Sequence, residues 1–492
     1  MPTALTEGAT PYADALRDWA ARGIERLLVP GHGGQDAVPE LTAFFGQDLL
    51  RLDIPPMVPG IDIGPDSPFA QAQALTARAW GARRTWFLAN GSSQANRIAA
   101  LALGFYHGPG QPVVVQRSIH SSFNDGIILA GLEARFVSPS IDQRLGIAHG
   151  ISPAALRKAL ADCPDAKAVY LVSPSFFGAA ADIAALADVA HEAGVPLVVD
   201  AAWAAHFGFH PALPPGAVRD GADLVIMSTH KLGGSLTQTA VLHLGPGPYA
   251  SDLEPLVQRA YMMEQSTSEN AWLLASIDLA RAALEQAGPR IEASVSFADE
   301  LRARVRAAGR FAVASDSFAA FDDIAAVDPL RFSVDVSAGG LIGHAVRDVL
   351  LREAGVYFEV STAACVVGIV PPGVRPDVGR IIGALHALAP DDPAVAGEQV
   401  HRPLPAPGPR AMLARDAAFA PAEVVPAREA VGRVSADTLA AYPPGIPNLM
   451  PGEVITGEVV EFLRQTAAAP SGLVRGALDP AVSALRVVRR LS

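Results

Sequence analysis

Residues 222–234 read Ala-Asp-Leu-Val-Ile-Met-Ser-Thr-His-Lys-Leu-Gly-Gly. The apolar first half is typical of a buried strand, and Lys231 follows it among hydroxyls, a histidine and glycines. A lysine in apolar surroundings loses its proton readily and becomes a nucleophile. Such a lysine can carry an aldehyde cofactor as a Schiff base while its neighbours bind a phosphate. The pattern also fits an ordinary solvated loop lysine, so other segments must decide between the two.

A second segment, Asn90-Gly91-Ser92-Ser93, stands between a predicted strand and a predicted helix. Small residues let the backbone approach an anion, and the amides at the start of a helix bind phosphate. Serine is also a common helix N-cap, which is the alternative interpretation. We identify Gly91, Ser92 and Ser93 as candidate phosphate ligands.

A third candidate, His120, lies four residues after a predicted strand that ends at Gln116. Ligands of open α/β folds bind at the carboxyl edge of the sheet, and a histidine in this place reaches that edge. Its ring could stack on the face of a cofactor. The alternative is a surface histidine without such a role.

Asp200 closes the apolar stretch Val198-Val199, and an unpaired carboxylate is costly to bury. A pyridinium nitrogen is a suitable partner, because the carboxylate keeps that nitrogen protonated and the ring can then accept electrons. A helix cap is the alternative role. The separation of 31 residues (231 − 200) between Asp200 and Lys231 leaves room for one connection and one further strand. Both side chains could therefore reach the same sheet edge.

These four features follow one another in a telling order along the chain: phosphate turn, stacking histidine, strand-end aspartate and Schiff-base lysine. Together they predict a site for pyridoxal 5'-phosphate (PLP). The surrounding pattern alternates helices and strands, which predicts an α/β fold with a mostly parallel sheet covered on both faces. The predicted helices are 69–80, 94–106, 122–130, 153–161 and 183–193, and the predicted strands are 85–89, 112–116, 134–137, 168–173, 196–200, 224–228 and 239–244.

The remaining chain is organised around that predicted sheet. Helical spacing covers 11–27, and a long helix over 272–287, continuing after Pro289 to about 308, is expected to lead into a smaller α+β domain. That domain has predicted strands at 331–336 and 365–369, a predicted helix at 342–353, and a second predicted helix from about 457. We predict an N-terminal segment (1–60), a PLP-binding large domain (61–288) and a C-terminal small domain (289–492) with a Pro/Ala-rich connector (389–427).

Composition narrows the class of protein further. The 492 residues carry a net charge of −12, which argues against nucleic acid and anionic membranes as partners, since both attract clustered Lys and Arg. The two cysteines form neither a disulfide framework nor a zinc pattern, so we expect no metal. The sequence shows no signal peptide and no long apolar span. We therefore expect a cytoplasmic enzyme that acts on a small molecule.

These residues resemble the Orn/Lys/Arg decarboxylase family from about residue 28 to 480. The most family-specific signal is the C-terminal pair of segments at 442–447 and 451–453. The resemblance implies the aspartate-aminotransferase-like fold type I, with a mostly parallel seven-stranded sheet in the large domain. The matching motifs are Pro30-Gly31-His32, Asn90-Gly91-Ser92-Ser93, His120, Asp200-Ala201-Ala202-Trp203, Ser228-Thr229-His230-Lys231, Thr237-Gln238, Ser266-Thr267-Ser268, Ser276-Ile277-Asp278, Tyr442-Pro443-Pro444-Gly445-Ile446-Pro447 and Pro451-Gly452-Glu453.

The resemblance also implies a role for each candidate residue in decarboxylating a basic L-amino acid of the lysine, ornithine or arginine class. Lys231 would hold PLP, Asp200 would pair with its ring nitrogen, and His120 would stack on the ring. Glu359 would face the cationic end of the substrate. The functional unit would be a homodimer, because Ser266 or Thr267 would reach the phosphate in the neighbouring subunit. The other implied cofactor contacts are Gly91, Ser92, Ser93, Ala202, Trp203, Ser228 and His230.

The chain departs from the family pattern at Gly33, Ser121, Ala201 and Trp203, which leaves the substrate open. Its first motif, at residue 29, leads us to expect no N-terminal wing domain. One alternative function is a PLP-dependent aminotransferase or oxidase, for which Arg331 or Arg375 would bind the substrate carboxylate. Another is a non-catalytic homologue that binds a partner.

Overall fold

The computed structural model describes residues 6–389, 392, 394–396, 404–442, 446–469 and 472–490. Residues 443–445 of the predicted C-terminal motif and parts of the predicted connector lie outside this range. The chain divides into two compact units, which we call unit 1 (1–102 and 198–289) and unit 2 (103–197 and 290–492). No helix within the described residues combines the length and apolar character that a membrane crossing needs.

The central element of the fold is a seven-stranded sheet with the order β1-β10-β9-β8-β6-β2-β3. Strand β10 runs antiparallel to β1 and β9, whereas the pairs β8–β9, β2–β6 and β2–β3 are parallel. The prediction of an α/β fold with a mostly parallel sheet is therefore confirmed.

Unit 1 contains the strands next to the Lys231 segment. Every residue of β9 is buried, as its unbroken apolar sequence predicts. Helix α4 begins where Ser67 accepts a hydrogen bond from the Ala70 amide and ends at Gly81 in the left-handed region. The elements are α1 (Pro11–Ala21), α2 (Pro39–Phe45), α3 (Gln47–Leu52), α4 (Pro68–Trp80), β1 (Arg84–Leu88), α5 (Gly91–His107, which continues into unit 2), β8 (Leu197–Asp200), β9 (Leu224–Met227), the π-helical turn η1 (Thr229–Gly233), β10 (Ala240–Leu244), α9 (Ala250–Glu264) and α10 (Ala271–Glu285).

Two predicted helices of this region differ from the structure. The prediction of helix over 11–27 is wrong beyond Ala21, because Gly23 adopts a φ of 61° and ends the helical path. The long predicted helix is two helices, α10 and α11, interrupted at residues 286–287.

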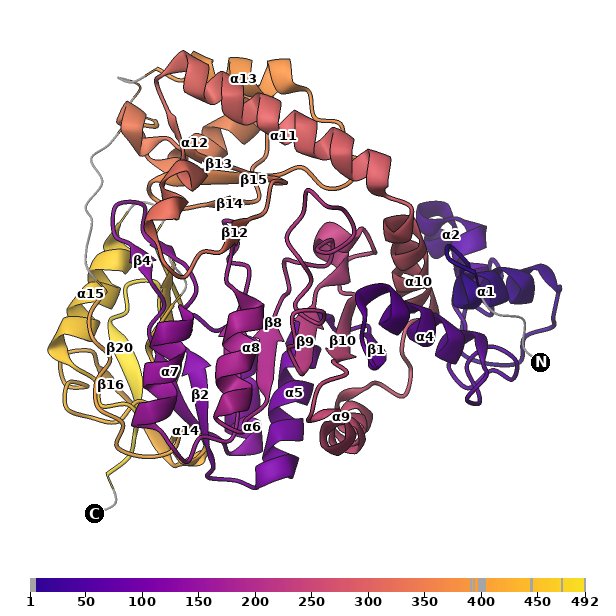
Figure 1. Cartoon of the computed structure of the whole chain (residues 1–492), viewed down its shortest axis with the longest axis horizontal. Helices are drawn as coiled ribbons and strands as arrows, with labels where there is room; N and C mark the ends of the chain where they lie inside the picture. The colour runs from indigo at the N-terminus through magenta and orange to yellow at the C-terminus, as the bar shows by residue number, and fades with distance from the viewer. Residues whose placement is uncertain are drawn as a thin grey trace. The chain divides into compact units, whose positions relative to one another are not determined.

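Unit 2 carries the first parallel strands and, further along the chain, a small four-stranded sheet with the order β11-β13-β15-β14. Helices α11 and α13 run along this small sheet (Figure 1), and their apolar side chains share one core with β13 and β15. The elements of its first part are β2 (Pro112–Gln116), α6 (Ser121–Ala130), β3 (Glu133–Val137), β4 (Ile141–Asp142), β5 (Ile147–Ala148), α7 (Pro153–Asp162), β6 (Val169–Val172), β7 (Ala179–Ala180) and α8 (Ile183–Glu192). The small-domain elements are α11 (Gly288–Ala308), β11 (Ala312–Val313), η2 (Ala314–Ala320), β12 (Ala326–Val327), β13 (Arg331–Asp335), η3 (Ser337–Gly339), α12 (Gly343–Val349), η4 (Leu350–Ala354), β14 (Val360–Ser361), β15 (Cys365–Ile369) and α13 (Val378–Ala387).

The C-terminal part of unit 2 has its own apolar core, formed by residues between Ala427 and Val487. Part of the predicted Pro/Ala-rich connector is regular structure, since it contains α14 and β16, and β16 pairs along its whole length with β20. The elements are α14 (Ala414–Phe419), β16 (Ala422–Pro426), β17 (Leu439–Tyr442), β18 (Pro447–Leu449), α15 (Gly457–Ala468), β19 (Leu473–Arg475) and β20 (Ala484–Val488).

Candidate active site

Lys231 lies on η1, the π-helical turn that follows β9 directly. Its ammonium nitrogen Nζ lies 3.7 Å from the centroid of the Trp203 ring. The face of an indole ring attracts a cation, so this contact holds the half-buried ammonium in place. Gly234 ends the turn with a φ of 85°, a conformation that favours glycine. The amino group of Lys231 is thus held just beyond the end of a buried strand.

A pair of hydroxyls lies on the two loops that the sequence predicted to bind phosphate. The hydroxyl of Ser228 donates to the hydroxyl of Ser92, with 2.9 Å between the oxygens. Gly91, at a φ of 69°, donates its amide to the carbonyl of Gln238 at 2.7 Å. Ser92 and Ser93 then occupy the first turn of α5, where backbone amides have no acceptor within the helix. Hydroxyls and helix-start amides together can bind a phosphate.

The histidine beside Lys231 is held by the next strand. Nδ1 of His230 lies 2.7 Å from the carbonyl oxygen of Thr239, which can only accept, so this nitrogen carries the proton. The hydroxyl of Thr229 also donates to that of Thr239 at 3.2 Å. The turn that carries Lys231 is therefore fastened to the start of β10.

Asp200 ends β8 with only 4% of its surface exposed. Its Oδ2 accepts from the side-chain amide of Asn96 at 3.0 Å, and its Oδ1 accepts from the backbone amide of Ala202 at 3.1 Å. The two amide donors orient the carboxyl group at the end of the strand. Asn96 was not recognised from the sequence. Its spacing of four residues from Ser92, which places both on one face of α5, was the available signal.

The residues predicted to serve a neighbouring subunit lie between α9 and α10. Ser266 and Thr267 are both exposed, and the hydroxyl of Ser266 accepts from the Ser268 amide at 3.0 Å. Unit 1 therefore holds all the candidate residues except His120 and Glu359.

His120 belongs to unit 2 and begins helix α6. Its Nδ1 accepts from the backbone amide of Ser122 at 3.2 Å and lies 2.7 Å from the Ser122 hydroxyl. The side chain is exposed although its ring is anchored at one nitrogen. The ring of His120 is thus anchored through Nδ1 at the start of α6.

Glu359 is exposed and immediately precedes β14. Arg331, the first residue of β13, is only 3% exposed. Its Nε forms an ion pair with Oδ2 of Asp328 at 3.3 Å. Burial lowers the pKa of Arg331, while the charges of Asp328 and Glu359 oppose this change. Of the two arginines considered for an aminotransferase, Arg331 is therefore already paired with a carboxylate, and Arg375 is exposed.

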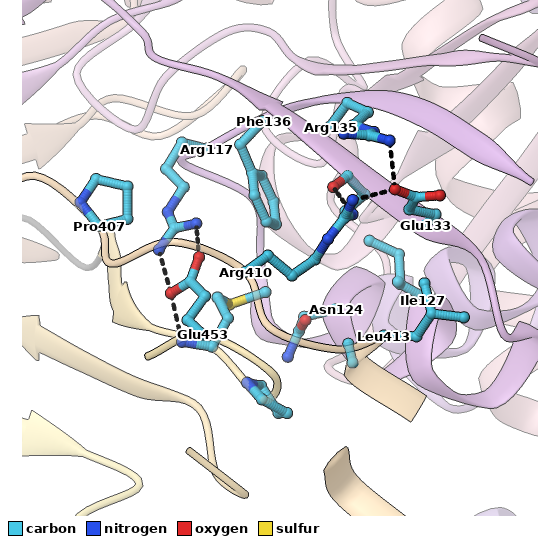
Figure 2. Close-up of a pocket in the computed structure, with 14 residues that line it drawn as sticks. Arg117, Asn124, Ile127, Glu133, Arg135, Phe136, Pro407, Arg410, Leu413 and Glu453 are labelled. Carbon is cyan, nitrogen blue, oxygen red and sulfur yellow. Dashed lines mark hydrogen bonds and ion pairs between the residues drawn. The ribbon is translucent and has the colours of Figure 1, made fainter. Parts of the chain in front are cut away.

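Unit 2 also contains a buried ion pair that was not predicted from the sequence. The guanidinium of Arg117, three residues before His120, faces the carboxylate of Glu453 (Figure 2). The pair borders a cavity of about 350 Å³ whose other side carries Arg410 and Glu133, which also form an ion pair.

The family models match this arrangement over most of the chain. Residues 10–375 match the major domain of Orn/Lys/Arg decarboxylase, and residues 403–472 match the C-terminal domain of the same family. The chain belongs to the Orn/Lys/Arg decarboxylase family. The predicted family and the prediction of an amino acid decarboxylase are thereby confirmed.

Individual proteins agree with this assignment. The chain is 35% identical to an arginine decarboxylase of Bacillus subtilis over 496 residues, which cover 99% of both proteins. Among solved structures, lysine decarboxylase A from Pseudomonas aeruginosa has a TM-score of 0.82 at 22% identity and covers 98% of this chain and 81% of that one. A serine palmitoyltransferase from Sphingomonas wittichii has a TM-score of 0.51 at 18% identity, with 71% of this chain and 81% of that one covered. These two structures show the fold, and the predicted fold type I is confirmed.

Proposed function

We propose that this protein decarboxylates a basic L-amino acid to the corresponding amine and CO2 with PLP as its cofactor. Arginine is the first candidate substrate, because the Bacillus subtilis relative that covers 99% of both chains is named arginine decarboxylase. Lysine and ornithine are the other members of the proposed class. The observation that carries the proposal is Lys231 at the end of β9, beside the Ser92–Ser228 hydroxyl pair.

The residues of unit 1 suit three groups of PLP: its phosphate, its ring nitrogen and its aldehyde. The hydroxyls of Ser92 and Ser228 and the first-turn amides of α5 suit a phosphate. The buried carboxylate of Asp200, oriented by Asn96, suits a protonated ring nitrogen. Lys231 supplies the amine that would hold the aldehyde carbon covalently. His230, Gly91 and Ser93 would complete the phosphate contacts, and Ala202 would pack against the ring.

Each side chain would have one task in the reaction. When bound, PLP supplies an electron-accepting ring that stabilises the charge left on the α-carbon as CO2 departs. Asp200 keeps a positive charge at the ring nitrogen, and His120 would press its ring against the cofactor. Lys231, or alternatively His120, would hold a proton and deliver it to the α-carbon in place of the departing CO2. The Trp203 ring, in contact with Nζ, would limit where that amine can move.

The substrate and the assembly form two finer parts of the proposal. Glu359 would attract the cationic end of the substrate, since opposite charges select a basic side chain. We propose a homodimer, in which Ser266 or Thr267 of one subunit would reach the phosphate held by its partner. Their exposure on the α9–α10 turn supports this assignment. A protein that stays monomeric at all concentrations in light scattering would contradict the dimer.

The decisive experiment combines a spectrum with product analysis. Purified protein loaded with PLP should show the visible absorbance of a covalently bound aldehyde, and Lys231→Ala should lose it together with turnover. Arginine, lysine and ornithine are then supplied separately, and products are identified by mass. An amine with CO2 supports the proposal. A keto acid or hydrogen peroxide would instead establish an aminotransferase or an oxidase, and absence of any visible band would reject PLP.

A further inference from the structure

The segment between β2 and α6 is tied to the C-terminal part of unit 2 by a buried ion pair. Nη1 and Nη2 of Arg117 lie 2.5 and 3.0 Å from Oε1 and Oε2 of Glu453. The side chains are 7% and 8% exposed. Figure 2 shows the two groups facing each other beside the Phe136 ring, over which the guanidinium lies at 4.5 Å. Two parallel hydrogen bonds fix direction as well as distance.

Further hydrogen bonds fix both members of this pair. Nε of Arg117 donates to the carbonyl of Pro447 at 3.1 Å, and the backbone amide of Met450 donates to Oε2 of Glu453 at 2.9 Å. The Glu453 carboxylate is therefore oriented by the Met450 amide as well as by the Arg117 guanidinium. A buried pair with its remaining hydrogen bonds satisfied leaves little freedom to the segment it holds.

A second contact holds the other end of the same segment. The side-chain amide of Asn124, on the first turns of α6, donates to the hydroxyl of Thr438 at 2.7 Å. His120 lies between the two anchors, three residues after Arg117 and four before Asn124. The C-terminal residues therefore hold both sides of the segment that presents the His120 ring.

We propose that Glu453 is a positioning residue, which acts through Arg117 to hold the His120 ring against the cofactor. The inference rests on the proposed function, because His120 stacks on PLP only if PLP is bound. Glu453 itself touches neither substrate nor cofactor in this account. In this proposal the C-terminal part of unit 2 influences cofactor binding indirectly, because Glu453 contacts Arg117 and not the cofactor.

The test replaces the ion pair by apolar groups of similar size. The double variant Arg117→Met with Glu453→Leu removes the directed contact, and such replacements of a buried pair often preserve folding. Glu453→Gln is a milder second variant, which keeps the shape and one hydrogen-bond acceptor. The control is Arg433→Met with Glu423→Leu, which removes a more exposed ion pair of 2.6 Å elsewhere in the C-terminal part.

Two measurements separate positioning from simple stabilisation. Hydrogen exchange of residues 117–124 in the cofactor-free protein should become about tenfold faster in the double variant and change less in Glu453→Gln. The dissociation constant for PLP should rise about two- to tenfold, the range that corresponds to a lost ring stacking. Visible circular dichroism of the bound cofactor should weaken. The control variant should change none of these three quantities.

The outcomes decide between the possibilities. A lower melting temperature with unchanged exchange at 117–124 and unchanged PLP binding would show that the pair only stabilises the fold, and would overturn the inference. Should the double variant fail to fold, Glu453→Gln gives the same comparison. If the wild-type protein binds no PLP, the proposed function fails, which is seen separately from the exchange result. Faster exchange without any effect on PLP affinity or dichroism would also overturn the positioning role.

Discussion

The ammonium of Lys231 lies 3.7 Å from the centre of the Trp203 ring, in a turn fastened to β10 through His230 and Thr239. The family resemblance implies that Trp203 contacts the cofactor, and Trp203 is also one of the residues at which the chain departs from the family pattern. The structure gives this ring a direct contact with the residue proposed to hold the cofactor.

Replacing Trp203 should show how much its contact with Lys231 contributes to the stability of the cofactor-free protein. We expect Trp203→Leu to lower the free energy of unfolding more than Trp203→Phe, because phenylalanine keeps a ring face for the ammonium. The coupling between Trp203→Leu and Lys231→Met should be about 0.5–2 kcal/mol in a double-mutant cycle measured by urea unfolding. A coupling near zero would mean that the ring and the ammonium do not interact in solution.

Asn96 offers a test of the Asp200 environment. Asn96→Leu removes a donor to a buried carboxylate and should lower the free energy of unfolding by about 1.5–3 kcal/mol in urea. Gln94→Leu is a matched control, since Gln94 is buried on the same helix but donates to the neutral acceptors Glu264 O and Gln265 Oε1. We expect about 0.5–1.5 kcal/mol there. Equal losses in the two variants would show that the hydrogen bond from Asn96 to Asp200 contributes no more than one to a neutral acceptor.

The sequence predicted well those features that depend on neighbours along the chain. The apolar run 224–227 is β9, and the strand at 112–116 has the predicted bounds, because uninterrupted apolar residues suit a strand buried on both faces. Helix α7 begins at Pro153, as predicted, with Ser152 as its N-cap. These signals are local, so one sequence suffices to read them.

Features that depend on pairing across the chain were not predictable in this way. Arg117 and Glu453 are separated by 336 residues, and no local sequence pattern predicts that the two side chains form an ion pair. A strand was predicted over 239–244 and is β10 (Ala240–Leu244), yet its antiparallel direction follows from the connection that precedes it rather than from its own residues. Such pairings are set by tertiary structure.

His243 should contribute to acid sensitivity. It is fully buried, Nδ1 lies 2.7 Å from the Thr85 hydroxyl, and its ring stacks on Trp80. Burial lowers its pKa from 6.5 to about 3. The unfolded chain therefore binds this proton more readily, so the stability contributed by the neutral ring is present above pH 6.5 and is lost as pH falls toward 3.

Between about pH 6 and pH 4, this group should add about 1.4 kcal/mol per pH unit to the slope of unfolding free energy. His243→Asn should lose that part of the slope in urea titrations at several pH values. His386→Asn, at an exposed histidine, controls for the loss of one imidazole. An unchanged slope in His243→Asn would show that the ring already takes up a proton inside the fold.

Glu269 should act in the opposite direction. Burial first, and then the like charge of Asp62, raise its pKa from 4.5 to about 7. The folded state therefore holds this proton more tightly than the unfolded chain does. Its contribution to stability is complete below pH 4.5 and is lost as pH rises through 7.

Because the effects of His243 and Glu269 overlap in pH, each must be measured as a variant minus the wild type. Glu269→Gln cannot ionise, so relative to wild type it should gain up to about 3 kcal/mol of unfolding free energy between pH 4.5 and pH 8. Asp62→Asn removes the like charge and should lower the pKa of Glu269 toward its ordinary value. The loss of stability with rising pH should therefore end at a lower pH and be smaller at pH 7 than in the wild type. A Glu269→Gln difference that does not grow with pH would show that this carboxyl is ionised in the folded protein throughout the range.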